Sequence, residues 1–217
     1  MRRCRSPQLL LASLACLSAL PAHAEWRRAS SAHFVVYGDV SERQIREYAQ
    51  RLERYDSALR LITGQPETAA TSHNRVEVYL LPSLSALRAL YGRGGELIGG
   101  FYNSSFEGSR AFMPADTSSI NLSAQTVMFH EYAHHMLLSS STEFYPRWLS
   151  EGMAEFFMVT RLNRDGSAII GLPNDERAYS LTAFSRMRAS ELLASDSRQL
   201  SRYDVDQLYA SGWLMTH

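Results

Sequence analysis

The sequence contains no lysine, only two cysteines and no long hydrophobic run. All 22 basic residues are arginine, and they are too dispersed to form the dense basic surface that nucleic-acid binding requires. A membrane-spanning helix needs about 20 consecutive apolar residues, and no stretch of the chain is that long. These absences point away from nucleic acid and membrane spans. They leave polypeptides or small molecules as the expected partners.

The first 24 residues have the pattern of a secretory signal peptide. A basic head, MRRCR, precedes a short apolar core at 9–20, and small residues lead to a cleavage position after Ala24. An uncleaved anchor is the alternative, but the core is too short to span a bilayer. A lipoprotein anchor at Cys16 lacks the expected leucine three residues earlier. We therefore predict export to the periplasm or the extracellular space, with 25–217 as a single domain that keeps neither cysteine.

Strand and helix patterns alternate in the first half of the predicted domain. The runs HFVVYG (33–38) and RVEVYLL (75–81) are rich in β-branched and aromatic residues, which is typical of strands. Between them, apolar residues recur at helical spacing from Ser41, the expected N-cap, to Gly64. A shorter helix is predicted over 84–91.

The second half contains the remaining strands and most of the helices. Residues 99–114 favour two strands joined by a turn. Helices are predicted over 125–138 and 147–160, and NRDGS (163–167) indicates a hairpin between them and later helical segments. Strands and helices are mixed rather than regularly alternating, so the predicted fold class is α+β with a small mixed sheet.

The segment VMFHEYAHHMLL carries the chemistry. His130 and His134 are four residues apart, so they lie on one face of a helix and can reach a single ion. Glu131 lies one step round the helix from these ligands. This HExxH arrangement is typical of zinc hydrolases, in which the glutamate handles a proton of the attacking water. The alternative is a core helix with satisfied histidines, and His135, which faces elsewhere, is interpreted as structural.

The later segment PRWLSEGMAEFF supplies the missing ligand. A catalytic zinc ion takes three protein ligands, and Glu151 lies on the next helix, which a short connection returns towards the histidines. Gly152 inside a helix costs about 1 kcal/mol relative to alanine, which a close helix crossing would explain. Glu155, one turn further, can accept the second N–H of a histidine ligand. A solvated acidic pair is the alternative, but the neighbouring residues are apolar.

The motifs HEYAH and WLSEGMAEFF together resemble the gluzincin metallopeptidases, and more narrowly the bacterial secreted peptidase-MA-like proteins with their W-L-x-E-G-x-A-E motif. The resemblance covers about 129–157. It implies that His130, His134 and Glu151 bind one zinc ion and that Glu131 is the general base. The interval from His134 to Glu151 is shorter than in the larger relatives, so their substrate specificity is not transferred.

The same resemblance implies further site residues. The transition-state donor should come from a later helix, where Tyr209 is the candidate and a core tyrosine is the alternative. An edge strand beside the metal helix should pair with extended peptide, and the resemblance assigns this role to Ala111, Phe112 and Met113. Glu155 matches the position of an acid that supports a ligand.

The sequence therefore predicts an exported zinc-dependent peptidase that acts on peptide or protein substrates. A catalytically silent binding module is the rival hypothesis, and hydrolysis of a non-peptide amide is a third. The apolar helix predicted at 204–215 is expected to pack on the catalytic unit. Because no helix-ending signal follows it, we expect that the native chain continues past His217.

Overall fold

The computed structural model places most of the domain predicted to follow the leader. It describes residues 25–67, 75–94, 98–105, 108–115, 124–140, 145–183, 185, 187–197 and 199–217. The predicted signal peptide, 1–24, lies outside the described residues. Within the described part of the chain, none of the helices combines the length and apolar character needed to cross a membrane. The fold is α+β with a small mixed sheet, which confirms the predicted fold class.

Five strands form the main sheet in the order β1-β2-β3-β5-β4. Their bounds are β1 (Arg27–Ser30), β2 (Phe34–Gly38), β3 (Val76–Leu81), β4 (Phe101–Ser105) and β5 (Gly108–Pro114). The inner pairs β2–β3 and β3–β5 are parallel, whereas the outer pairs β1–β2 and β4–β5 are antiparallel. β4 therefore lies at one edge of the sheet, and β5 is an internal strand.

Helix α1 (Glu42–Thr63) begins and ends at the predicted residues. The Ser41 hydroxyl oxygen accepts a hydrogen bond from the Gln44 backbone N–H, and the Ser41 backbone N–H donates to the Gln44 side-chain oxygen, which makes a capping box. Gly64 ends the helix in the left-handed conformation, with φ of 70°. The apolar stripe that includes Ile45 and Leu52 is buried against the sheet. Local signals are thus sufficient to determine this helix.

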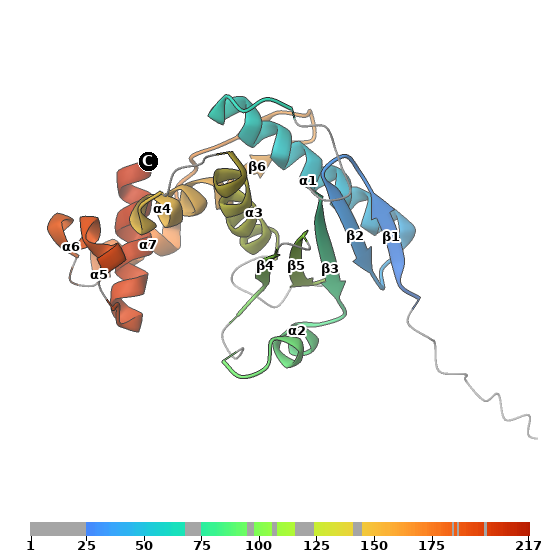
Figure 1. Ribbon diagram of the computed structural model, residues 1–217. Coiled ribbons are helices and arrows are strands. Elements are labelled where there is room, and N and C mark those ends of the chain that lie inside the picture. The colour runs from blue at the N-terminus through green and yellow to red at the C-terminus, as the bar shows by residue number, and fades with distance from the viewer. Residues whose placement is uncertain are drawn as a thin grey trace, which may run out of the picture.

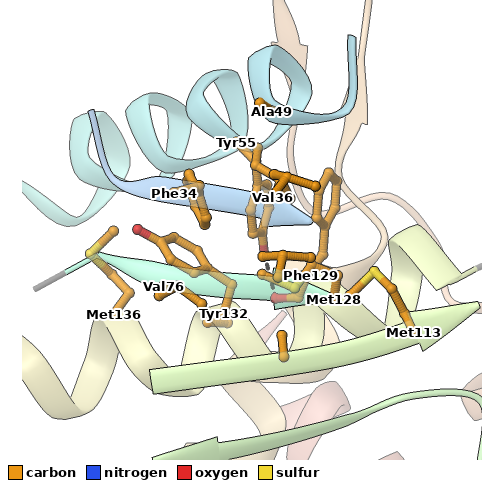
Figure 2. Packing of buried hydrophobic residues seen from close by; sticks show 14 of the residues in the cluster. Phe34, Val36, Ala49, Tyr55, Val76, Met113, Met128, Phe129, Tyr132 and Met136 are labelled. Carbon is orange, nitrogen blue, oxygen red and sulfur yellow. Dashed lines mark hydrogen bonds between the residues drawn. The ribbon is translucent and has the colours of Figure 1, made fainter. Parts of the chain in front are cut away.

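The core lies between one face of the sheet and two helices, α1 and α3 (Ala124–Ser140). Figure 2 shows Tyr55 of α1 and Phe129 of α3 meeting inside this layer. Their rings stack 3.6 Å apart, and the Tyr55 hydroxyl donates to the Phe129 carbonyl oxygen at 2.9 Å. Deleting a buried aromatic side chain costs about 3–5 kcal/mol. This packing therefore fixes α3, the helix that carries HExxH, in its rotation against the sheet.

The opposite face of the sheet carries an aromatic ladder. Tyr37, Tyr79, Phe112 and Phe101 occupy paired positions on four neighbouring strands. Successive rings are stacked at 5.1, 5.0 and 4.7 Å between centroids. Cross-strand aromatic pairs of this kind stabilise a sheet. Phe112 therefore packs between the rings of Tyr79 and Phe101 within this ladder.

The helices that follow α3 in the chain are α4 (Arg147–Met158), α5 (Asp175–Ala183), α6 (Ala189–Leu193), the short 3-10 helix η2 (Ser195–Ser197) and α7 (Arg202–Thr216). They form a group in which α4 lies beside α3 and the others pack around α4 and α7 (Figure 1). The predicted hairpin is present as β6 (Arg161–Leu162) and β7 (Ala168–Ile169). Helix α2 (Leu84–Tyr91) follows β3, as predicted.

Three expectations need correction. The strand β1 and the helix α5 were missed, because β1 has only four residues with no apolar alternation and α5 is largely polar. The assignment of Ala111, Phe112 and Met113 to an edge strand is wrong. They belong to β5, whose backbone pairs with β3 on one side and β4 on the other. Because both sides of β5 are already paired, a substrate peptide cannot add to this strand.

Candidate metal centre

The rotation of α3 divides its side chains into two sets. Met128, Phe129 and Tyr132 are buried in the core. His130 and His134 lie on the side that faces α4, with only 13% and 18% of their side chains exposed. The helix therefore presents the two imidazoles towards a second helix instead of towards water.

Glu151 of α4 completes a compact group of three side chains. The Nε2 atoms of His130 and His134 are 3.2 Å apart. Oε2 of Glu151 lies 3.5 Å from His130 Nε2 and 3.3 Å from His134 Nε2. Ligand atoms bound at about 2.1 Å to one tetrahedral ion would be about 3.4 Å apart. The three atoms thus have the separations of one face of a zinc coordination tetrahedron.

The state of Glu151 also fits a cation. Among the described residues, its Oε2 is buried without a hydrogen-bond donor in good geometry. Burial alone would raise the pKa of this carboxyl, but the neighbouring imidazoles of His130 and His134 outweigh burial and lower it to about 2. The carboxylate is therefore charged at neutral pH. Two imidazoles and one carboxylate form a donor set that zinc commonly takes.

Gly152 explains how α4 reaches this position. A Cβ atom placed on Gly152 would lie 2.4 Å from the carbonyl oxygen of Gly212 in α7. A Cβ on Gly212 would in turn lie 2.6 Å from the Trp148 carbonyl oxygen. The close helix crossing expected at Gly152 is present, and its partner is α7. This crossing sets the depth at which Glu151 sits.

Each histidine of the group also has a polar partner on its other ring nitrogen. His134 Nδ1 lies 3.1 Å from the Ser150 hydroxyl oxygen. His130 Nδ1 lies 3.4 Å from Oε1 of Glu155, whose side chain is 1% exposed. Partners in these positions orient the imidazoles and select the tautomer whose Nε2 lone pair faces the ion. Glu155 thus lies where the sequence interpretation expected it.

Glu131 faces an open space beside the three-residue group. It lines a cavity of about 530 Å³ together with Tyr91, Phe101 and Asn103. Burial raises the pKa of Glu131 from its ordinary value, although the nearby histidines partly offset that effect. Larger surface hollows, of about 800, 810 and 730 Å³, lie along β1, α1 and the β6–β7 hairpin and include none of the side chains of His130, His134 and Glu151.

The strand β4 is held directly against the helix that carries Glu131. A Cβ on Gly100, just before β4, would lie 2.8 Å from Val127 Cγ1 of α3, so only glycine permits this approach. The Tyr102 hydroxyl is hydrogen-bonded to His135 Nδ1 at 2.7 Å. Burial lowers the pKa of His135 to about 4, so the ring is neutral. His135 therefore connects the strand to the helix and does not join the metal group.

Tyr209 of α7 lies close to the same group. Its ring centroid is 6.1 Å from that of His130. Burial, followed by the negative charges of Glu151 and Glu155, raises the pKa of Tyr209 to about 12, so the hydroxyl keeps its proton at neutral pH. The packing of α7 on α4 brings this tyrosine to the site.

The substrate residues predicted from sequence are not part of this arrangement. Ala111 and Met113 are each 1% exposed within the core, and Phe112 belongs to the aromatic ladder. Sequence reasoning also missed Ser150, which contacts His134, and Asn174 and Arg177, which contact Glu155. Ser150 is adjacent to Glu151 and could have been considered. Asn174 and Arg177 are brought in only by tertiary packing.

A second cluster of possible ligands, His33, Glu53 and Asp56, lies in the core. Its charge is already balanced by the protein. The Arg60 guanidinium contacts both oxygens of Asp56 at 2.9 and 3.0 Å, and Tyr132 donates to one of them at 2.6 Å. A bound cation would have to displace this arginine. The group of His130, His134 and Glu151 is therefore the better metal site.

Comparison with known proteins adds one match. The sequence pattern of a family described as "Protein of unknown function (DUF1570)" matches residues 123–217. This segment includes α3, α4 and α7, and with them all the side chains of the candidate metal centre. No curated protein matches the chain.

Proposed function

We propose that the chain is an exported zinc-dependent peptidase of the gluzincin type. The observation that carries this proposal is the spacing of 3.2–3.5 Å among the three ligand atoms of His130, His134 and Glu151. Their separations and chemistry fit one tetrahedral zinc ion. Glu131, next to this group and facing a cavity, supports hydrolysis rather than a structural metal.

A zinc ion at this site would act as a Lewis acid and lower the pKa of water. The residues of the chain supply the remaining functions. Glu131 accepts a proton from the attacking water and delivers it to the leaving amine, and its raised pKa suits an acid–base role. The protonated hydroxyl of Tyr209 donates to the carbonyl oxygen as negative charge develops there.

The edge strand β4 is the proposed peptide-binding element. It is the terminal strand of the sheet on the side of α3, so among the described residues its outer side has no neighbouring strand in the main sheet. The cavity beside Glu131 is lined by Phe101, Tyr102 and Asn103 of this strand. An extended peptide added antiparallel or parallel to β4 would pass in front of Glu131. This role replaces the one assigned to β5 from sequence.

The test combines metal analysis with an unbiased peptide library. We expect one zinc ion per chain and cleavage of at least one class of peptide. Glu131→Gln should retain zinc and the folded structure but lose about 10²-fold or more in turnover, because the amide cannot accept a proton. The exposed Glu47→Gln is the matched control and should behave as the wild type. Zinc binding without cleavage of any peptide would favour the binding module, and absence of zinc binding would refute the metal centre.

A further inference from the structure

Arg177 of α5 is a buried arginine that contacts no atom of the metal group yet is connected to it. It is 9% exposed. Its Nε and Nη2 donate to Oε2 and Oε1 of Glu155 at 2.7 and 3.0 Å, and its Nη1 donates to Asp206 of α7 at 3.1 Å. All three guanidinium nitrogens therefore have carboxylate partners. Bidentate pairs of this kind fix orientation as well as charge.

Glu155 is the intermediate between Arg177 and the metal group. Besides Arg177, its Oε2 accepts a hydrogen bond from the Asn174 amide at 3.1 Å. The same Asn174 accepts a hydrogen bond from the Arg177 backbone N–H at the start of α5. Both oxygens of Glu155 are thus held by Arg177 of α5, and Oε2 also by Asn174, the residue that precedes this helix. Oε1, the oxygen shared with Arg177 Nη2, is the one that lies 3.4 Å from His130 Nδ1.

The consequence concerns the tautomer of His130. A carboxylate fixed opposite Nδ1 keeps the proton on that nitrogen and leaves the Nε2 lone pair facing Glu151 and His134. Without a rigid partner, the buried Glu155 carboxylate would turn away from His130 towards other polar groups, because an uncompensated buried charge is costly. The order of contacts is Asp206, Arg177, Glu155 and His130, and it crosses α7, α5, α4 and α3 in turn.

Arg177 also lies behind the proposed donor Tyr209. Its guanidinium carbon is 5.3 Å from the centre of the Tyr209 ring. A guanidinium over an aromatic face attracts the ring and limits its movement. His130, which belongs to the candidate metal centre, and Tyr209, which lies beside it, are therefore supported by the same arginine.

We propose that Arg177 is a positioning residue of the metal centre: by clamping Glu155 it holds His130 in the metal-binding orientation, and by contact with its ring it holds Tyr209. This inference rests on the proposed zinc site. The alternative is that Arg177 only anchors α5 and α7 to α4. A role limited to anchoring would change stability but would leave the zinc affinity of the folded protein unchanged.

The test is Arg177→Lys, which keeps the positive charge but removes the two-pronged contact. Zinc affinity is measured by competition with a chelator, and cobalt(II) is substituted to record the visible ligand-field spectrum, which reports coordination geometry. We expect zinc affinity to fall about 10–100-fold, the range for removing a partner of a metal ligand. We also expect the cobalt spectrum to change.

Arg60→Lys is the matched control. Arg60 also holds a buried carboxylate through two contacts, and that carboxylate, Asp56, is bonded to Tyr132 on the metal helix α3. This variant should lose stability while zinc affinity and the cobalt spectrum stay at wild-type values. An equal drop in zinc affinity for both variants would overturn the proposal, because the effect would then follow stability alone.

Asp206→Asn provides a second, milder variant in case Arg177→Lys does not fold. Asp206 is partly exposed and holds only Nη1 of Arg177. A smaller decrease in zinc affinity in the same direction is expected. If Arg177→Lys and Asp206→Asn both fold and both keep wild-type zinc affinity, the positioning role of Arg177 is refuted and the proposed zinc site is not. Absence of zinc binding by the wild type would refute both proposals.

Discussion

Substituting Gly152 with alanine tests the helix crossing that places Glu151. In an open helix this change stabilises by about 1 kcal/mol, because alanine has the higher helix propensity. At the crossing, the new Cβ would lie 2.4 Å from the Gly212 carbonyl oxygen and 2.6 Å from Thr216 Oγ1. The first of these atoms belongs to the backbone and cannot rotate away. The two helices must separate, and overpacking of this kind costs about 3 kcal/mol at the upper end of its usual range.

Helix propensity would stabilise the alanine variant and overpacking would destabilise it, so the sign of the change in melting temperature distinguishes the two effects. The net loss should be about 2 kcal/mol, which corresponds to a decrease in melting temperature of about 4–8 °C for a domain of this size. Zinc affinity should fall as well, because the adjacent Glu151 moves with α4 and metal–ligand distances tolerate only about 0.2 Å. The assays are thermal unfolding in the presence of chelator and zinc competition. A melting temperature equal to or above that of the wild type would show that α4 and α7 do not approach at this glycine.

Two further substitutions separate binding from chemistry. Glu151→Ala should remove most of the zinc and the stability that zinc confers, because metal-binding free energy is also folding free energy; full zinc retention measured by elemental analysis would exclude Glu151 as a ligand. Tyr209→Phe should keep zinc and fold but lower turnover about 10²–10³-fold, the size of one lost donor to a developing oxyanion; unchanged turnover with a peptide substrate would mean that Tyr209 is only a packing residue.

The parts of the site that local spacing determines were predictable. His130, Glu131 and His134 follow from the geometry of one helix turn, and Glu151 and Glu155 follow from a second motif on the next helix. The limits of α1 were also predictable, since Ser41 and Gly64 carry strong capping signals. In each case the residues that predict the helix end or the candidate site residue lie within a few positions of it in the sequence.

Strand order and tertiary partners were not predictable in this way. The alternation in 109–114 indicates a strand with one buried face, but nothing in it distinguishes an internal strand from an edge strand. The difference depends on which strand of the β4–β5 pair lies next to β3. That strand is β5, so β4 is outermost. Arg177 illustrates the second limit. Its two carboxylate partners are 22 and 29 residues away, so no periodicity connects them.

The candidate centre and the proposed substrate strand come from different parts of the chain. The segment that matches the family of unknown function, 123–217, contains all three candidate ligands as well as Glu131, Arg177 and Tyr209. β4 and the end of α2, which line the cavity beside Glu131, precede that segment. The segment is not independent of the rest, because α3 is oriented by its contact with Tyr55 of α1. In the proposed function the sheet has two roles: its core face orients α3, and the outer edge of β4 would offer the backbone on which a peptide is aligned. If the proposal holds, substitutions confined to β4 should change which peptides bind, whereas those in α4, α5 and α7 should change zinc affinity.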